Sequence, residues 1–306
     1  MIKFLQGNCI DKIKELEDNS IDCVVSSPPY FGLRDYGVDG QFGLEKTYQD
    51  YLTNTVKVFE TFKPKLKDTA TIWWNVGDSY SSGKRTTTTN QSLRGNKDYG
   101  VTRTPVQQGI KEKDLLMIPN RVAIALQYAG WYIRSEIIWH KPNPMPESVK
   151  DRPTNSHEKI WLITKSKKYY YDADAIKEPV ADISIKRVKY GYKAAHKSSP
   201  YNYMNTPKQG KRFCDPAGRN KRNVWTITTQ PFKDAHFATF PKDLIEPCIK
   251  AGCPENGIVL DPFGGAGTTG IVAKSLNRQS ILIELNSEYI KIAKKRAEKE
   301  FGLFNE

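Results

Sequence analysis

The spacing of hydrophobic and polar positions predicts alternating strands and helices over residues 1–175 and 236–306. Short apolar runs rich in β-branched and aromatic residues predict strands over 2–6, 21–26, 69–75, 131–139, 159–164, 257–261 and 280–284. Apolar residues at helical spacing predict helices over 10–17, 47–62, 119–129, 241–251, 268–277 and 286–300. Strands that alternate with helices favour an α/β fold with a doubly wound, mostly parallel sheet.

Two segments break this pattern. Residues 81–113 are rich in Thr, Gly, Asn, Gln and basic residues, which predicts a mobile basic loop. The stretch 183–222 contains eleven Lys or Arg against one acid, Asp215, with aromatic residues between them. Although a charge run is often only a solvated face, this ratio favours contact with a polyanion. The candidate contact residues are Lys186, Arg187, Lys189, Lys211, Arg212, Arg219, Lys221 and Arg222.

The overall charge supports the same interpretation. The 306 residues carry a formal charge of +13, which favours a nucleic-acid partner, with an anionic membrane surface as the competitor. No apolar run approaches the roughly 20 residues of a membrane span, and no signal pattern follows Met1, so we expect a soluble cytoplasmic protein without membrane contact. The cysteines and histidines are dispersed, so we expect reduced thiols and no metal site.

One candidate binding site is a glycine turn near the C-terminus. The strand that ends at Asp261 continues into Pro262-Phe-Gly-Gly-Ala-Gly267, which opens a helix. Glycines allow close approach of a ligand, and the helix N-terminus offers N–H groups. A second strand ends at Glu284, whose carboxylate is suited to accept from ribose hydroxyls. A turn needed only for packing and an ordinary dinucleotide site are the alternatives.

The other candidate site is Ser27-Pro28-Pro29-Tyr30, which follows the apolar strand 21–26. A small polar residue, two prolines and an aromatic ring at a strand end are suited to hold a flat base by its exocyclic amino group. The two prolines lack backbone donors and stiffen the turn, which leaves an acceptor-only surface. The alternative is a proline-rich turn with a packing tyrosine. Pro247-Cys248 matches the nucleophile of carbon-5 cytosine methylation, but it lies inside the predicted helix 241–251, so Cys248 is interpreted as packing.

Together these motifs resemble the DNA amino methyltransferases, which methylate N4 of cytosine or N6 of adenine. Ser27–Tyr30 resembles their motif IV, Val259–Thr269 their motif I and His236–Asp243 their motif X. Further likeness appears at 73–78, 139–143, 151–153, 157–158 and 168–172. The catalytic motif precedes the cofactor motif, which is the permuted order of the β group. The resemblance implies the S-adenosylmethionine-dependent methyltransferase fold, with a catalytic half at 1–175, a target-recognition region at 176–235 and a cofactor-binding half of the same domain at 236–306.

The resemblance also implies a role for each site residue. Ser27 and the Pro28 carbonyl would accept from the target amine, Pro29 would stiffen the turn and Tyr30 would stack on a base flipped out of double-stranded DNA. The residues implied for S-adenosyl-L-methionine are Asn8, Cys9, Phe240, Pro241, Lys242, Asp261, Pro262, Phe263, Gly265, Gly267, Thr268 and Glu284. Family members often have Asp where this chain has Asn8.

Several alternatives stay open. Ser at position 27 is commoner in the N4-cytosine members, so we expect cytosine, with adenine N6 as the alternative. A DNA-binding protein that keeps the fold without catalysis is an alternative of another class. A nicotinamide oxidoreductase would leave Ser27–Tyr30 and the basic stretch unexplained. The sequence leaves open the recognition sequence, a cognate restriction endonuclease and a homodimer.

Overall fold

One sheet of eight strands organises the computed structural model, which describes residues 1–81, 107, 109–180, 217–230 and 240–302. The strands are β1 (Ile2–Gln6), β2 (Ile21–Ser26), β3 (Leu66–Val76), β4 (Tyr132–His140), β5 (His157–Thr164), β6 (Val224–Thr226), β7 (Ile258–Asp261) and β8 (Gln279–Glu284). Their order is β1-β8-β7-β2-β3-β5-β4-β6. Among these described strands only β5 runs against the others, so the predicted mostly parallel sheet is confirmed.

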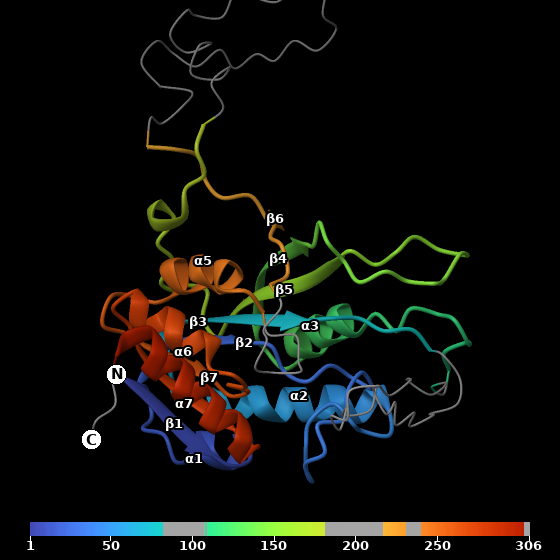
Figure 1. Cartoon of the computed structure of the whole chain (residues 1–306), viewed down its shortest axis with the longest axis horizontal. Helices are drawn as coiled ribbons and strands as arrows, with labels where there is room; N and C mark the ends of the chain where they lie inside the picture. The colour runs from blue at the N-terminus through green and yellow to red at the C-terminus, as the bar shows by residue number, and fades with distance from the viewer. Residues whose placement is uncertain (82–106, 108, 181–216, 231–239, 303–306) are drawn as a thin grey trace, which may run out of the picture. The chain divides into compact units, whose positions relative to one another are not determined.

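Helices cover both faces of this sheet. They are α1 (Cys9–Lys14), α2 (Tyr48–Phe62), α3 (Ile118–Tyr128), α5 (Lys242–Gly252), α6 (Thr268–Ser275) and α7 (Ser287–Phe301), with a short 3-10 turn, η1, at Asp174–Ile176. Side chains of β3 alternate between the two faces: Trp74 packs on Phe59 of α2, whereas Trp73 and Thr71 lie against Gly252 of α5. Figure 1 shows α2 and α5 on opposite sides of β3, as in a doubly wound fold.

The core on the α2 side is aromatic, and its rings pack the long helix α2 on the long strand β3. Phe59 lies edge-on to Trp74 and Trp131, with ring centroids 5.0 and 5.4 Å away. Thr47 caps α2 by accepting from the Asp50 N–H at 3.1 Å, and Pro64 follows its last turn. The helix thus presents its apolar face to the sheet over four turns.

All predicted strands and helices are present, with ends that differ by a few residues. Strand β3 is longer than the predicted 69–75 because it begins at Leu66 and continues to Val76. Strand β6 was not predicted, since three residues are too short for a periodic signal. Most of the predicted loop 81–113 lies outside the described residues. Within the described residues, no helix is long and apolar enough to span a membrane.

The chain divides into two compact units, Met1–Tyr171 with Asn223–Glu306, and Asp172–Arg222. The two ends of the second unit are joined, because the backbones of Glu178 and Arg219 form two hydrogen bonds with each other, at 2.9 and 2.8 Å. Its C-terminal boundary falls earlier than the predicted region 176–235, because Val224–Thr226 pair with β4 in the first unit. The predicted halves 1–175 and 236–306 share one sheet, since β7 pairs with β2 and β8 pairs with β1.

Candidate active site

One edge of the sheet collects the polar side chains. Strands β8, β7, β2 and β3 are parallel, so their carboxyl ends meet at the same edge, which is where ligands bind in open α/β sheets. Strand β5 is antiparallel to β3 and therefore begins there, and β4 ends there. As a result Glu284, Asp261, Ser27, Asn75 and Glu158 lie at strand ends along a single edge.

The glycine turn after β7 has the backbone conformation that its sequence predicted. Gly265 and Gly267 have φ of +48° and +81°, in the left-handed region that side chains disfavour. A Cβ on Gly267 would lie 2.8 Å from Cβ of Ala293 in α7, so the turn packs directly on that helix. A Cβ on Gly265 would meet only the Phe263 carbonyl at 3.9 Å. This backbone is therefore open to a neighbour on the Gly265 side, as a ligand-binding turn requires.

Glu284 ends β8 beside this turn. Its two carboxylate oxygens accept from the Gly265 N–H at 2.9 Å and the Asn286 N–H at 2.8 Å. Burial raises the pKa of Glu284, while these two hydrogen bonds oppose the rise. Each carboxylate oxygen has a second acceptor position, so the half-buried group can take ribose hydroxyls in addition. The donor and acceptor set thus fits the ribose of a nucleoside cofactor.

Asp261, a predicted cofactor residue, lies buried at the start of the glycine turn. It is only 1% exposed, and it accepts from the hydroxyls of Ser26 and Thr269, both at 2.6 Å, and from the Phe263 N–H at 3.1 Å. Burial raises the pKa of Asp261 to about 6. The carboxylate thereby joins the end of β2 to the glycine turn and to the first turn of α6, which sets the position of Ser27 relative to the glycine turn.

The remaining predicted cofactor residues surround this edge. Asn8 caps α1 by accepting from the Ile10 N–H at 2.9 Å, and its neighbour Gly7 donates to the Glu284 carbonyl at 3.0 Å. Burial raises the pKa of the Cys9 thiol to about 12, so this thiol stays protonated. Lys242, at the start of α5, pairs with Glu300 at 2.5 Å.

The other predicted cofactor residues belong to the turn and to the start of α5. Pro262 and Thr268 are buried in the turn, and Phe263 packs on Phe42 with ring centroids 5.4 Å apart. Phe240 and Pro241 precede α5. A small hollow at this place is lined by Val25, Ser26, Trp73, Asn75, Ile160, Phe240, Leu244, Ile245 and Cys248. The structure therefore brings the predicted motif X residue Phe240 next to the end of β2.

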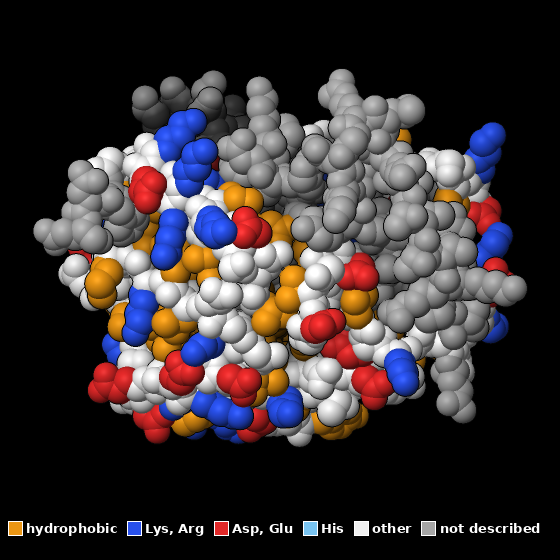
Figure 2. All heavy atoms as spheres, turned by 60° about the horizontal axis from the view of Figure 1, so that its bottom comes forward, with side chains coloured by type: hydrophobic (Ala, Val, Ile, Leu, Met, Phe, Trp, Pro, Cys, Tyr) orange, Lys and Arg blue, Asp and Glu red, His pale blue; other side chains and the backbone are white. Residues whose placement is uncertain are grey.

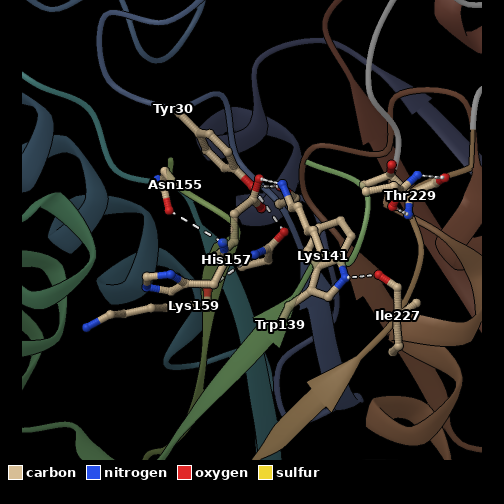
Figure 3. Close-up of polar contacts among 12 residues, drawn as sticks. Tyr30, Trp139, Lys141, Asn155, His157, Lys159, Ile227 and Thr229 are labelled. Carbon is tan, nitrogen blue, oxygen red and sulfur yellow. Dashed lines mark hydrogen bonds and ion pairs between the residues drawn. The ribbon is translucent and has the colours of Figure 1, made fainter. Parts of the chain in front are cut away.

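Side chains from several strands converge on Tyr30 (Figure 3). The Ser27 hydroxyl donates to the Tyr30 oxygen at 3.2 Å, and the Tyr30 hydroxyl lies 2.6 Å from Glu158 and 3.1 Å from the amide oxygen of Asn75. Lys141, just after β4, forms an ion pair with Glu158. Burial, and then the Glu158 charge, raise the pKa of Tyr30 well above its ordinary value, so the phenol stays protonated.

The turn that carries Tyr30 is held from two other sides. A Cβ on Gly77, just past β3, would lie 2.5 Å from the Tyr30 ring, so this ring rests directly on the Gly77 backbone. The Pro29 carbonyl accepts from the hydroxyl of Tyr51 in α2 at 3.2 Å. Cys248 is buried in α5 and its thiol donates to the Leu244 carbonyl at 3.4 Å, as expected of a packing residue.

Sequence reasoning missed Asn75, Lys141 and Glu158 as site residues. Each lies in a segment whose likeness to the family was noted, 73–78, 139–143 or 157–158, but without a role. The usable signal was position: a polar residue at the end or start of a predicted strand. The antiparallel direction of β5, which places Glu158 at this edge, was not part of the prediction.

The predicted polyanion-contact residues are described only in part. Lys186, Arg187, Lys189, Lys211 and Arg212 lie outside the described residues. Arg219 and Arg222 pair with Glu178 at 3.3 and 3.0 Å. Burial acts to raise the pKa of Glu178, but the hydrogen bonds from Arg222 outweigh it and lower the pKa. Within the described residues no group of three or more His, Cys, Asp or Glu is arranged for a metal ion.

Comparison with known proteins identifies this arrangement. The model of the N6/N4 DNA methylase family matches residues 21–295. The chain belongs to this family. Among curated relatives of this DNA methylase, the type II methyltransferase M.SmaI of Serratia marcescens is 44% identical, over 96% of this chain and 90% of that protein. The type II methyltransferase M.Cfr9I of Citrobacter freundii is 43% identical, over 96% and 87%.

Solved structures share the fold of this DNA methylase. The PvuII DNA methyltransferase, described as cytosine-N4-specific, matches with a TM-score of 0.62 at 18% identity, over 99% of this chain and 87% of that chain. A putative DNA modification methylase from Thermus thermophilus, solved in complex with S-adenosyl-L-methionine, matches with a TM-score of 0.62 at 19% identity, over 99% and 96%. These likenesses confirm the predicted methyltransferase fold.

Proposed function

We propose that this DNA methylase transfers a methyl group to the exocyclic N4 of cytosine in double-stranded DNA. Its cofactor is S-adenosyl-L-methionine, which supplies an electrophilic methyl group on a positively charged sulfur. The observation that carries the proposal is the 2.6 Å hydrogen bond from Ser26 to Asp261. This bond fixes the candidate base-binding residue Ser27 directly beside the glycine turn proposed to bind the cofactor, so that donor and acceptor meet at one place.

The residues at Ser27–Tyr30 suit an exocyclic amine. Such a nitrogen is a poor nucleophile because its lone pair is delocalised into the ring. Acceptors on its two N–H bonds favour a localised lone pair, and we assign this role to the Ser27 hydroxyl and the Pro28 carbonyl. Positioning and fixed dipoles then supply most of the rate, and no covalent intermediate is needed. The base must leave the duplex to reach them.

The choice of cytosine over adenine rests on Ser27, since a serine at this position is commoner in the N4-cytosine members. The fold neighbour named as cytosine-N4-specific supports this choice. Adenine N6 is the alternative, with the same residues in the same roles. Because the relatives are named type II methyltransferases, we also propose that this enzyme acts in a restriction-modification system with a cognate endonuclease.

The distribution of charge supports DNA contact by the segments between the described elements. Residues 82–106, 108, 181–216, 231–239 and 303–306 hold 14 of the 47 Lys and Arg but 5 of the 34 Asp and Glu, and thus +9 of the net +13. The described face in Figure 2, by contrast, mixes Lys and Arg with Asp and Glu. Basic side chains neutralise phosphates and give affinity that falls with salt. We propose that Arg219, Lys221 and Arg222 act with the basic residues of 183–216.

The deciding experiment identifies the methylated nucleoside. The protein is incubated with unmethylated DNA of varied sequence and S-adenosyl-L-methionine, and the DNA is digested and analysed by chromatography and mass. N4-methylcytosine is expected. N6-methyladenine would overturn the interpretation of Ser27 but keep the chemistry. No methylated base at all would favour a DNA-binding protein without catalysis. Ser27→Ala is expected to lower turnover by about 10²-fold or more, with cofactor affinity nearly unchanged.

A further inference from the structure

The contacts of Tyr30 determine which way hydrogen bonds run at the target-base site. Ser27, Tyr30 and Glu158 form a chain, with Tyr30 in the middle and oxygen–oxygen distances of 3.2 and 2.6 Å. We call these three residues the relay. A serine or tyrosine hydroxyl has one proton to donate, whereas an ionised carboxylate only accepts. The direction of each hydrogen bond in the relay therefore depends on the group at its end.

Glu158 is held as the accepting end. Lys141 forms an ion pair with one of its oxygens, and both side chains are largely buried, at 18% and 16% exposure. The other oxygen faces the Tyr30 hydroxyl at 2.6 Å, a distance typical of a hydroxyl that donates to a carboxylate. Asn75 is 3.1 Å from the same hydroxyl and presents its amide oxygen, another acceptor, because its NH₂ group donates to the Lys159 carbonyl.

The number of protons in the relay then determines the direction of the hydrogen bond between Ser27 and Tyr30. The Tyr30 proton is used toward Glu158, so the Tyr30 oxygen faces Ser27 with lone pairs only. Ser27 must therefore donate its own proton to Tyr30, as the 3.2 Å contact is arranged. What Ser27 has left to offer a third group is its lone pairs. A serine without this partner could instead donate to the lone pair of the target nitrogen, which would hinder attack on the methyl group.

We propose that Glu158 is a positioning residue that acts through Tyr30 to fix the Ser27 hydroxyl as an acceptor for the amine of the target base. This rests on the proposed function, in which Ser27 accepts from that amine. The pKa of Tyr30, raised by burial and by Glu158, agrees with a phenol that keeps its proton. The relay gives the neutral Ser27 hydroxyl the acceptor character that a carboxylate would have by itself. Lys141 compensates the buried charge of Glu158.

The relay is tested by single-turnover methylation with Glu158→Gln and Tyr30→Phe. The first weakens the acceptor, and the second removes the connecting hydroxyl but keeps the ring. Each is expected to lower the rate of methyl transfer about tenfold or more, with the affinities for S-adenosyl-L-methionine and DNA within about twofold of wild type. Glu136→Gln is the matched control, because Glu136 pairs with Lys159 at 2.6 Å on the neighbouring strands outside the relay. It should leave the rate unchanged.

The Ser27→Ala background separates a relay from general support of the fold. If Glu158 acts through Ser27, Glu158→Gln has no further effect once Ser27 is absent. An equal loss in both backgrounds, or a full rate in Glu158→Gln, would overturn the proposal. If the product is N6-methyladenine, the proposed target base is wrong, but the same comparison of variants still tests the relay.

A readout without turnover keeps the relay testable even if the wild-type protein proves inactive. Carbon-13 NMR of tyrosine labelled at Cζ, with the Tyr30 signal assigned by its loss in Tyr30→Phe, reports the hydrogen bond of the Tyr30 hydroxyl at neutral pH. In Glu158→Gln this signal should shift, because the carboxylate 2.6 Å from the hydroxyl is gone. An unchanged signal would show that Glu158 does not hold the Tyr30 proton.

Discussion

The cofactor end and the target-base end of the candidate site share one sheet edge but are built differently. At the cofactor end the groups come mostly from one segment, Asp261–Thr269, with Glu284 beside it, and backbone N–H groups make many of the contacts. At the base end the groups come from separate segments, at Ser27, Asn75, Lys141 and Glu158, and they meet through side chains. The first end depends on local backbone shape, and the second depends on how the strands are arranged.

This contrast predicts different sensitivities. Adding a carbon atom to the turn at the cofactor end should damage both the fold and cofactor binding, because the turn is packed against α7. Changing a hydrogen-bonding side chain at the base end should damage catalysis and leave cofactor binding nearly intact. Each prediction below tests one side of the contrast, and they run from the largest expected effect to the smallest.

Gly267→Ala should have the largest effect. The substitution places a Cβ 2.8 Å from Cβ of Ala293 and forces alanine into a φ of +81°. Left-handed backbone costs about 1–2 kcal/mol and overpacking about 1–3 kcal/mol, so the unfolding free energy should fall by about 3 kcal/mol. Denaturant unfolding measures this loss, and calorimetry should show weaker cofactor binding. Gly265→Ala is the control for the unfolding free energy alone, because its Cβ meets no atom closer than 3.9 Å. Equal losses of unfolding free energy in the two variants would contradict the packing argument.

The raised pKa of Asp261 predicts that the unfolding free energy depends on pH. Its pKa is about 6 in the folded protein, against 3.8 ordinarily, so the native state binds more protons between these values. The stability linked to Asp261 is therefore full below pH 4 and is lost as pH rises through 6. Relative to Asp261→Asn, which does not titrate, wild type should lose on the order of 3 kcal/mol between about pH 4 and 7. Unfolding of both proteins across this range measures the difference.

A second variant sharpens the Asp261 prediction. Thr269 donates to the Asp261 carboxylate at 2.6 Å, and this hydrogen bond lowers the pKa of Asp261. Thr269→Val should therefore move the loss of stability to higher pH. A loss that stays at the same pH, or a constant difference between wild type and Asp261→Asn, would show that this carboxylate does not titrate as described.

Gly77→Ala tests the base end by shape alone. Its Cβ would lie 2.5 Å from the Tyr30 ring, so the ring must move, and displacement of about 1 Å can lower a rate about 10²-fold. We expect a loss of that order in turnover, with cofactor affinity nearly unchanged. Because the damage acts through the ring, Gly77→Ala combined with Tyr30→Ala should be no slower than Tyr30→Ala alone. A double variant that is much slower would point to a role of Gly77 apart from Tyr30.

The same contrast explains how far the sequence alone predicted the site. Gly265, Gly267 and Glu284 follow from turn chemistry and strand ends, which are local signals. Glu158 does not, because its place depends on the reversed direction of β5 between β3 and β4. Asp261 was placed correctly at the turn, but its burial against Ser26 and Thr269 depends on packing. The strand β6 was not predicted, because it is short and is defined by its long-range pairing with β4.

Asn8 supplies the smallest effect and tests where the cofactor end stops. Its side-chain oxygen caps α1 through the Ile10 N–H at 2.9 Å, so Asn8→Ala should lower the unfolding free energy by about 1 kcal/mol. Asn8→Ser keeps an N-cap oxygen and should recover that stability. We expect that Asn8 also contacts the cofactor through its amide NH₂, which serine lacks. Asn8→Ser should then bind S-adenosyl-L-methionine as weakly as Asn8→Ala does. If Asn8→Ser instead restores both stability and affinity, Asn8 only caps α1, and the cofactor site consists of Glu284 and the glycine turn without Asn8.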